Sequence, residues 1–151
     1  MPWVYATDMT IPTDNQLAAL SAAFDLFTRR YKLAEALGPA KPLNELDKQV
    51  LFYVAQNGGC GPTDVARFLG VATTTISSAT NRLAKEGLLV RKRPEQDRRA
   101  VALQLSDSGS DRAETLRLGY RELCMRMLEP LSGAERETFI TLIQKIVPNE
   151  S

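Results

Sequence analysis

Hydrophobic residues recur at intervals of three and four over most of this 151-residue chain, which predicts a mainly helical protein. Four stretches of this kind, separated by Gly and Pro residues that end helices, cover residues 14–37, 44–56, 107–129 and 133 onward. Asn44, Ser106 and Ser132 stand just before three of these stretches. They are the expected N-caps, because their side-chain oxygens can accept a hydrogen bond from a free backbone N–H.

Between residues 61 and 105 the spacing of the hydrophobic residues changes, and shorter elements are predicted. In order they are a helix over 62–69, a helix over 73–86, a strand over 88–93 and a returning strand over 100–105. Gly87 ends the second helix, since glycine best tolerates a left-handed helix terminus. Helix, turn, helix and two-stranded ribbon form a winged helix-turn-helix, whose second helix is shaped to lie in a DNA major groove.

The second helix of this unit has a polar face of short hydroxyls and one amide. Its members are Thr73, Thr74, Thr75, Ser77, Ser78, Thr80 and Asn81. Ile76, Ala79 and Leu83 form the opposite, apolar face. Hydroxyls and amides can bind phosphate oxygens or base edges, and an Asn can form two hydrogen bonds to adenine. The alternative is that the polar residues only cap and solubilise the helix, but their place between a helix-turn and a basic ribbon favours DNA binding.

Positive charge is concentrated in the same region. Residues 62–105 hold eight Lys and Arg against four Asp and Glu, a net charge of +4, whereas the rest of the chain has a net charge of −3. A basic module on an acidic body suits DNA, because neutralising phosphates and releasing their counterions supplies most of the sequence-independent affinity. A charge cluster alone is more often a solvated surface. Here the cluster coincides with the predicted ribbon, and this coincidence is what favours DNA binding.

The stretches LNELDKQVLFYVAQNG and PTDVARFLGVATTTISSATNRLAKEGLLVRKRPEQDRRAVALQLSDSG resemble the MarR family of bacterial transcriptional regulators. The most specific part is the ribbon tip, Asp97-Arg98-Arg99, followed by an alternating strand. In this family an arginine of the tip enters the minor groove and an aspartate orients it. The resemblance therefore implies that Arg99 is the inserted residue and that Asp97 supports it. Narrow minor grooves concentrate negative potential and attract Arg, which is consistent with this role.

The predicted DNA-binding residues lie on the second helix and on the ribbon. They are Thr73, Thr74, Thr75, Ser77, Ser78, Asn81, Arg82, Arg91, Arg93, Asp97, Arg98 and Arg99. Those at the start and middle of the helix are expected in the major groove, while Arg91, Arg93 and Arg98 are expected to bind phosphates. One departure from the family is Ala72, where many relatives have a capping residue, so Thr73 is the expected cap.

We expect a single domain in two lobes. Residues 43–106 form the winged helix-turn-helix lobe that binds DNA, and residues 1–42 and 107–151 form dimerisation helices. The terminal helices have apolar stripes and no core of their own to cover, so pairing with the same helices of a second subunit is the economical solution. The resemblance implies the same homodimer. Its two recognition helices, about 34 Å apart, would bind a pseudo-palindromic operator in double-stranded DNA, most simply as a repressor.

Members of this family bind ligands between the dimerisation helices and the DNA-binding lobe, which implies a small aromatic or amphipathic effector. Residues that could line such a pocket are Phe24, Phe27, Tyr31, Tyr53, Leu116 and Tyr120. A core or dimer contact is the more frequent role for any one of them. A ligand that prefers a DNA-incompetent spacing of the recognition helices would weaken DNA binding by its differential affinity.

Other function classes find less support. Histidine is absent, which removes the commonest general base and metal ligand, so no enzyme activity, metal site or cofactor is expected. Some relatives sense oxidants through cysteine. Cys60 lies in a Gly-rich turn and is the more exposed candidate, whereas Cys124 is expected in the core.

No membrane-spanning run or signal peptide is evident, and a cytoplasmic location is expected. A protein-interaction module that kept the winged helix but lost DNA binding is the remaining alternative, against which the basic ribbon speaks.

Overall fold

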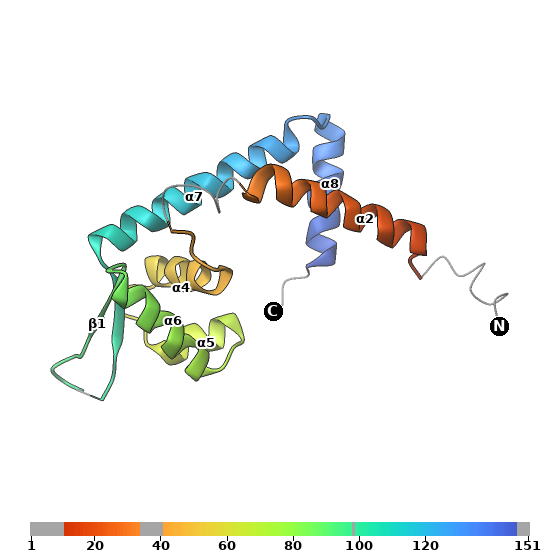
Figure 1. Ribbon diagram of the computed structural model, residues 1–151. Helices are drawn as coiled ribbons and strands as arrows, with labels where there is room; N and C mark the ends of the chain where they lie inside the picture. The colour runs from red at the N-terminus through yellow and green to blue at the C-terminus, as the bar shows by residue number, and fades with distance from the viewer. Residues whose placement is uncertain (1–10, 34–40, 98, 148–151) are drawn as a thin grey trace. The chain divides into compact units, whose positions relative to one another are not determined.

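The computed structural model describes residues 11–33, 41–97 and 99–147. Packing divides the chain into two units, Met1–Pro42 and Leu43–Ser151, and each is considered by itself. Helices predominate, and the sheet found among the described residues is a two-stranded antiparallel ribbon (Figure 1). The predicted fold class, mainly α with a small β-wing, is confirmed.

The unit Met1–Pro42 is described as one helical stretch. α2 (Asp14–Phe27) begins after Thr13, whose side chain caps it, and continues into the π-helical turn η1 (Thr28–Lys32). No residue of α2 is buried, and its exposed apolar side chains are Leu17, Leu20, Phe24 and Leu26. The sequence predicted this helix over 14–37, of which residues 34–37 lie outside the described part of the chain.

The unit Leu43–Ser151 contains the winged helix-turn-helix and two further helices. Its elements are α4 (Glu45–Gln56), α5 (Pro62–Leu69), α6 (Thr73–Lys85), β1 (Leu89–Lys92), β2 (Ala102–Leu105), α7 (Asp107–Leu128) and α8 (Gly133–Ile146). The side chains of Asn44, Ser106 and Ser132 accept hydrogen bonds from backbone N–H groups at the starts of α4, α7 and α8, as predicted. Gly87, which follows α6, has a φ of 76°, the left-handed conformation expected of it.

The start of α6 differs from the expectation. The N-cap is Ala72, whose extended backbone carries no capping side chain, and Thr73 is the first residue inside the helix. The Ala72 carbonyl accepts hydrogen bonds from the N–H groups of Thr75 and Ile76, so the first hydrogen-bonded turn of α6 starts at Ala72. Thr73 is then already inside the helix and is not in the position of a cap. The prediction that Thr73 is the cap was therefore wrong, and α6 begins without side-chain capping.

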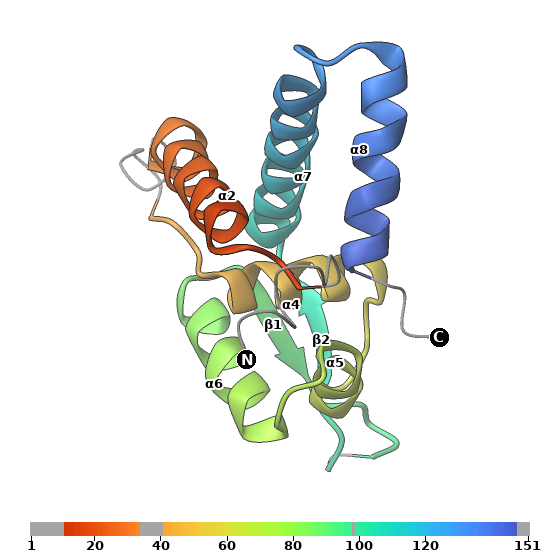
Figure 2. The same cartoon turned by 90° about the vertical axis from the view of Figure 1, so that its right-hand side faces the viewer.

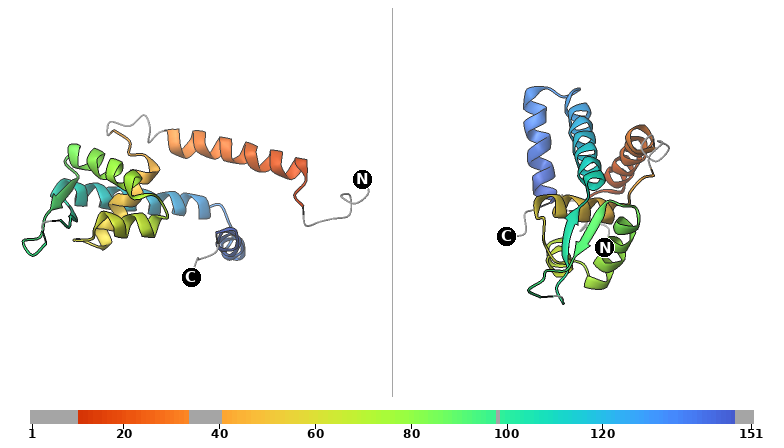
Figure 3. Two further views of the ribbon diagram at one scale, coloured as in Figure 1. Left: turned by 90° about the horizontal axis from the view of Figure 1, so that it is seen from below. Right: turned by 90° about the vertical axis from the view of Figure 1, so that its left-hand side faces the viewer.

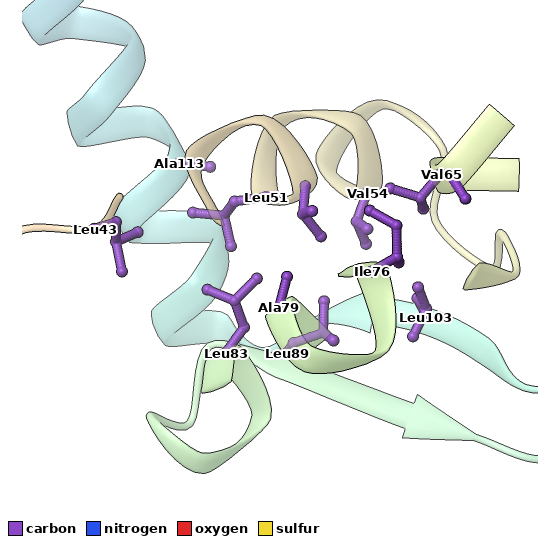
Figure 4. Close-up of a cluster of buried hydrophobic side chains, with 12 residues drawn as sticks. Leu43, Leu51, Val54, Val65, Ile76, Ala79, Leu83, Leu89, Leu103 and Ala113 are labelled. Atoms are coloured by element: carbon purple, nitrogen blue, oxygen red, sulfur yellow. The ribbon is translucent and has the colours of Figure 1, made fainter. Parts of the chain in front are cut away.

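One apolar core lies between α4, α6 and the ribbon. Figure 4 shows buried side chains of these elements pointing toward one another, joined by Ala113 from α7. Leu51 of α4, Ile76 and Leu83 of α6 and Leu103 of β2 are completely buried. Burying side chains of this size stabilises a fold by about 1.5–3 kcal/mol each, so this core fixes how α6 sits on α4.

The ribbon is attached to the helices on both sides. β1 and β2 pair in the register Leu89 with Leu105 and Arg91 with Leu103, and Figure 2 shows the two strands side by side, with α6 next to β1. On its other edge β2 meets the loop after α4, where the Leu103 N–H donates to the Cys60 carbonyl at 2.7 Å. The base of the ribbon is therefore held at a fixed place relative to α4, while its tip extends beyond the helices (Figure 3).

The start of α7 is joined tightly to the end of α6. Ser106 donates a hydrogen bond through its Oγ to the Gly87 carbonyl at 2.5 Å and through its N–H to the Leu88 carbonyl at 3.1 Å. Gly109 lies so close to the same turn that a Cβ on it would be 1.9 Å from the Leu88 carbonyl oxygen. Only glycine fits at this contact, which fixes the first turn of α7 against the turn that follows α6.

Candidate nucleic-acid interface

The helix α6 presents one apolar and one polar face. Ile76, Ala79 and Leu83 are buried in the core, as predicted. The side chains exposed to solvent are Thr73, Thr74, Thr75, Ser77, Ser78 and Asn81. Thr80 was predicted on the polar face, but it is buried and its Oγ1 donates to the Ser77 carbonyl at 3.0 Å. Its position next to Ala79 places it at the margin of the core, where a hydroxyl satisfied by its own helix can be accommodated.

Two hydroxyls of the polar face are already engaged with the helix. Ser77 donates to the Thr73 carbonyl at 3.1 Å, and Ser78 donates to the Thr74 carbonyl at 3.3 Å. Each hydroxyl keeps its oxygen lone pairs for an incoming donor. In this conformation the two serines therefore offer hydrogen-bond acceptors to a ligand lying along α6.

Arg82 forms an ion pair that the sequence did not reveal. Its guanidinium binds the carboxylate of Asp47 on α4 through two hydrogen bonds, Nε to Oδ2 at 3.1 Å and Nη2 to Oδ1 at 2.9 Å. The hydrogen bond to Asp47 raises the pKa of Arg82 above its ordinary value. Asp47 is buried. Arg82 thus holds α6 against α4, and its predicted contact with DNA stays a prediction.

Asn81 and Arg91 connect α6 to the ribbon. The Nη1 group of Arg91 on β1 donates a hydrogen bond to the Oδ1 of Asn81. Both residues were predicted to bind DNA, but no sequence signal indicated that they touch, because they are ten positions apart in elements of different type. The contact places a positive charge of the ribbon beside the polar face of α6.

The ribbon tip carries exposed cationic side chains, among them Arg93 and Arg99. Asp97 accepts a hydrogen bond at 3.0 Å from the backbone N–H of Arg99, so its carboxylate orders the turn around Arg99. The resemblance implied a support of this kind, although the contact is with the Arg99 backbone. Arg98 lies outside the described residues.

The residues predicted to line an effector pocket are distributed over both units. Phe24, Phe27 and Tyr31 belong to the unit Met1–Pro42, and the rings of Phe27 and Tyr31 lie 5.0 Å apart. In the other unit, Tyr53 packs on Phe68 of α5 with ring centroids 4.8 Å apart. Leu116 packs against the core. A pocket that combines all six residues therefore stays a prediction.

A groove of about 870 Å³ lies between α4, β2 and α7, within the unit Leu43–Ser151. Its lining includes Phe52, Tyr120, Glu114 and Arg117. The rings of Phe52 and Tyr120 meet edge to face, with centroids 6.2 Å apart. Arg117 pairs with Glu114 at 2.6 Å, and hydrogen bonding to Arg117 lowers the pKa of Glu114. The groove thus combines aromatic side chains with an ion pair, and of the six predicted pocket residues it includes Tyr120.

The two cysteines are placed differently from the expectation. Cys124 is exposed, and Cys60 is half-buried where its backbone meets β2. Burial, and next the negative charge of Asp64, raise the pKa of the Cys60 thiol. A raised pKa disfavours the thiolate that reacts with oxidants. The idea that Cys60 is the more exposed thiol was wrong, because Cys60 pairs through its backbone with Leu103 of β2 and is half-buried there.

Within residues 11–33, 41–97 and 99–147, no cluster of three His, Cys, Asp or Glu side chains could hold a metal ion. Over the same residues, no helix has the length and hydrophobicity needed to span a membrane.

Comparison with known proteins places this geometry in a family. A model of the MarR family matches residues 42–100. The uncharacterized HTH-type transcriptional regulator YwhA of Bacillus subtilis (strain 168) is 31% identical over 115 residues, which cover 76% of this chain and 82% of YwhA. The chain belongs to the MarR family. It is therefore a MarR-family transcriptional regulator, and its relatives are regulators rather than enzymes.

Solved structures with the MarR fold are similar over most of the chain. Streptococcus pneumoniae FabT, crystallised in complex with DNA, has a TM-score of 0.73 and 18% identity, covering 86% of this chain and 91% of FabT. The PcaV transcriptional regulator of Streptomyces coelicolor, crystallised with its natural ligand, has a TM-score of 0.65 and 24% identity, covering 91% of this chain and 96% of PcaV. Both likenesses confirm the winged-helix fold.

Proposed function

We propose that this MarR-family regulator is a homodimeric repressor of a short inverted-repeat operator. The observation that carries the proposal is the exposed polar face of α6 beside a cationic ribbon. In the complex, Thr73, Ser77 and Asn81, with their neighbours on that face, contact base edges and phosphates in the major groove. The solved complex of FabT with DNA supports DNA as the partner of this fold. Such a protein acts where the chromosome is, in keeping with the cytoplasmic location expected from the sequence.

In the proposed complex the ribbon binds next to the major groove. Arg99 enters the minor groove while Arg91, Arg93 and Arg98 bind phosphates. Cations in this arrangement contribute affinity for any duplex, whereas α6 contributes the preference for one sequence.

A fluorescence anisotropy titration with two duplexes tests DNA binding. One duplex carries the inverted repeat nearest the gene of this protein, and the other has a scrambled sequence. At low salt we expect the protein to bind both duplexes. Near physiological salt it should still bind the inverted repeat but not the scrambled duplex, because the free energy from counterion release falls while the sequence-specific contacts remain. A protein that binds neither duplex at low salt would instead be the protein-interaction module.

An effector site is proposed in the groove between α4 and α7. Its aromatic pair, Phe52 and Tyr120, suits a flat apolar ligand, and the Glu114–Arg117 ion pair in its lining suits a polar substituent. PcaV crystallised with its natural ligand, which supports a ligand-binding role for the fold. A panel of small aromatic acids added to the protein–DNA complex should include compounds that release the duplex. The variant Tyr120→Ala should require higher concentrations of them, while its affinity for DNA without ligand stays unchanged.

A further inference from the structure

The amide of Asn81 has a partner that restricts which bases it can recognise. Arg91 donates a hydrogen bond to its Oδ1. An arginine side chain has donors and no acceptor, so the oxygen of the Asn81 amide faces Arg91 and the NH2 group is left for another partner. The exposed amide is therefore fully available as a donor, while its acceptor oxygen is engaged by Arg91.

The position of Arg91 follows from the register of the ribbon. Side chains alternate between the two faces of a strand, so Arg91 is on the same face of β1 as Leu89 and lies opposite Leu103. Leu89 and Leu103 are both buried in the core beneath α6. Arg91 thus lies on the side of β1 that faces α6, whereas Lys92 is on the opposite side.

The neighbours of Asn81 on α6 make its donor distinctive. The hydroxyl protons of Ser77 and Ser78 are used in hydrogen bonds to carbonyls of their own helix. Among these three exposed side chains, the Asn81 NH2 group supplies the donor and the serines supply acceptors. This arrangement selects for a base that offers an acceptor opposite Asn81.

We propose that Arg91 is a positioning residue for Asn81, and that the pair makes α6 prefer guanine over adenine at the base that Asn81 faces. The inference rests on the proposed binding of α6 in the major groove. An unrestrained Asn binds adenine through both halves of its amide, accepting from N6 and donating to N7. With Oδ1 already accepting from the Arg91 guanidinium, it is held toward the ribbon and is a poorer acceptor for the N6 amino group of adenine. Guanine offers two acceptors, O6 and N7, to the free NH2 group.

Selection of bound duplexes from a library with randomised half-sites tests the proposal. The full chain and the variants Arg91→Ala, Asn81→Ala and the double variant are each used, and the enriched sequences are compared position by position. At one position of each half-site the native protein should favour guanine over adenine about tenfold. Arg91→Ala frees the Asn81 oxygen and should reverse this preference toward adenine. Asn81→Ala, alone or with Arg91→Ala, should abolish it.

Lys92→Ala is the matched control, since it removes one positive charge from the opposite face of the same strand. It should weaken binding to all duplexes equally and leave the preferred base unchanged. If Arg91→Ala behaves like Lys92→Ala, or if the native protein already favours adenine at the position lost in Asn81→Ala, the proposed restraint is overturned while DNA binding stands. If the native protein enriches no duplex at low salt, DNA binding by α6 fails and the inference fails with it.

Discussion

At the scale of single residues, the Arg82–Asp47 ion pair shows how two side chains position the recognition helix. Asp47 is buried, with 6% of its side chain exposed, whereas 46% of the Arg82 side chain is exposed. The two partners therefore depend on the pair unequally. A guanidinium without its carboxylate can turn toward water, but a buried carboxylate without its guanidinium cannot.

We expect Arg82→Ala to destabilise the fold more than Asp47→Ala does. A buried carboxylate left without its partner is costly, because it keeps its charge without a hydrogen-bonded cation or full access to water. The double variant should recover part of the loss, because it removes the stranded charge. Urea unfolding followed by circular dichroism measures all three variants. Equal losses from the two single substitutions would mean that Asp47 does not depend on Arg82.

Arg99 is the residue of the ribbon tip for which the sequence implied the most specific role. Its side chain is exposed, and its backbone N–H is held by Asp97. Removing one cation that neutralises a phosphate or fills the minor groove reduces the number of counterions released on binding. Arg99→Ala should therefore weaken DNA binding and lower the slope of log K against log salt concentration by about one unit. Lys145→Ala, on α8, serves as a control, and an Arg99→Ala slope equal to that of the control would contradict the role.

Cys60 gives a prediction about pH. Burial and the charge of Asp64 raise the pKa of its thiol, so the protonated form is favoured in the folded protein. The variant Cys124→Ser leaves Cys60 as the single thiol. At pH 8, iodoacetamide should modify Cys60 more slowly in the folded protein than in the protein unfolded in urea. The difference between the two rates should shrink as the pH rises through the raised pKa of Cys60. Mass spectrometry of timed samples measures the rates. Equal rates at pH 8 would show that the thiol is neither shielded nor shifted, and would reopen a redox role.

At the scale of elements, the turn that joins α6 to β1 also fixes α7. Gly109 contacts the Leu88 carbonyl, and the space there excludes even a methyl group. A rigid joint between these elements would transmit the orientation of α7 to the recognition helix. No such close contact exists at Gly119 in the middle of α7, where a Cβ would meet nothing within 4 Å.

The two glycines provide a matched pair of substitutions. Gly109→Ala should destabilise the protein by about 3 kcal/mol, because the added carbon forces the first turn of α7 away from Leu88. Gly119→Ala should stabilise it by up to about 1 kcal/mol, since alanine favours the helix and finds open space. Thermal unfolding of both variants provides the measurement. A Gly109→Ala protein as stable as the parent would show that the joint is loose.

The order and type of the elements could be predicted from the sequence because local signals determine them. Hydrophobic spacing located the helices, while Asn44, Ser106 and Gly87 marked their ends through bonds within a few residues. Contacts between distant segments gave no such signal. The Asp47–Arg82 pair joins positions 35 apart, and Cys60 pairs with a strand more than 40 positions away. The polar face of α6 was identified except for Thr80, whose burial depends on how the helix is rotated against α4.

At the scale of the whole molecule, the helices α2 and α8, each within its own unit, leave apolar side chains uncovered. α8 has no buried residue, and its exposed apolar side chains include Leu142, Ile143 and Ile146. α2 is exposed along its apolar stripe as well. Surfaces of this kind on terminal helices support the proposed homodimer, in which each subunit would cover the stripes of the other.

Disrupting this surface separates dimerisation from DNA contact. Leu142→Glu combined with Ile146→Glu places charges in the apolar stripe of α8 and should shift the protein from dimer to monomer, measured by light scattering against a chain mass of 16.7 kDa. Two monomers then bind the two half-sites independently, without the gain in effective concentration that a dimer has. Affinity for a duplex with two half-sites should therefore fall at least about 100-fold, while affinity for a single half-site changes little. Gln144→Glu, which adds a charge outside the stripe, should remain dimeric and bind normally. A parent protein that is already monomeric, or a monomeric variant that keeps full affinity for the two-site duplex, would be incompatible with a repressor that reads an inverted repeat as a dimer.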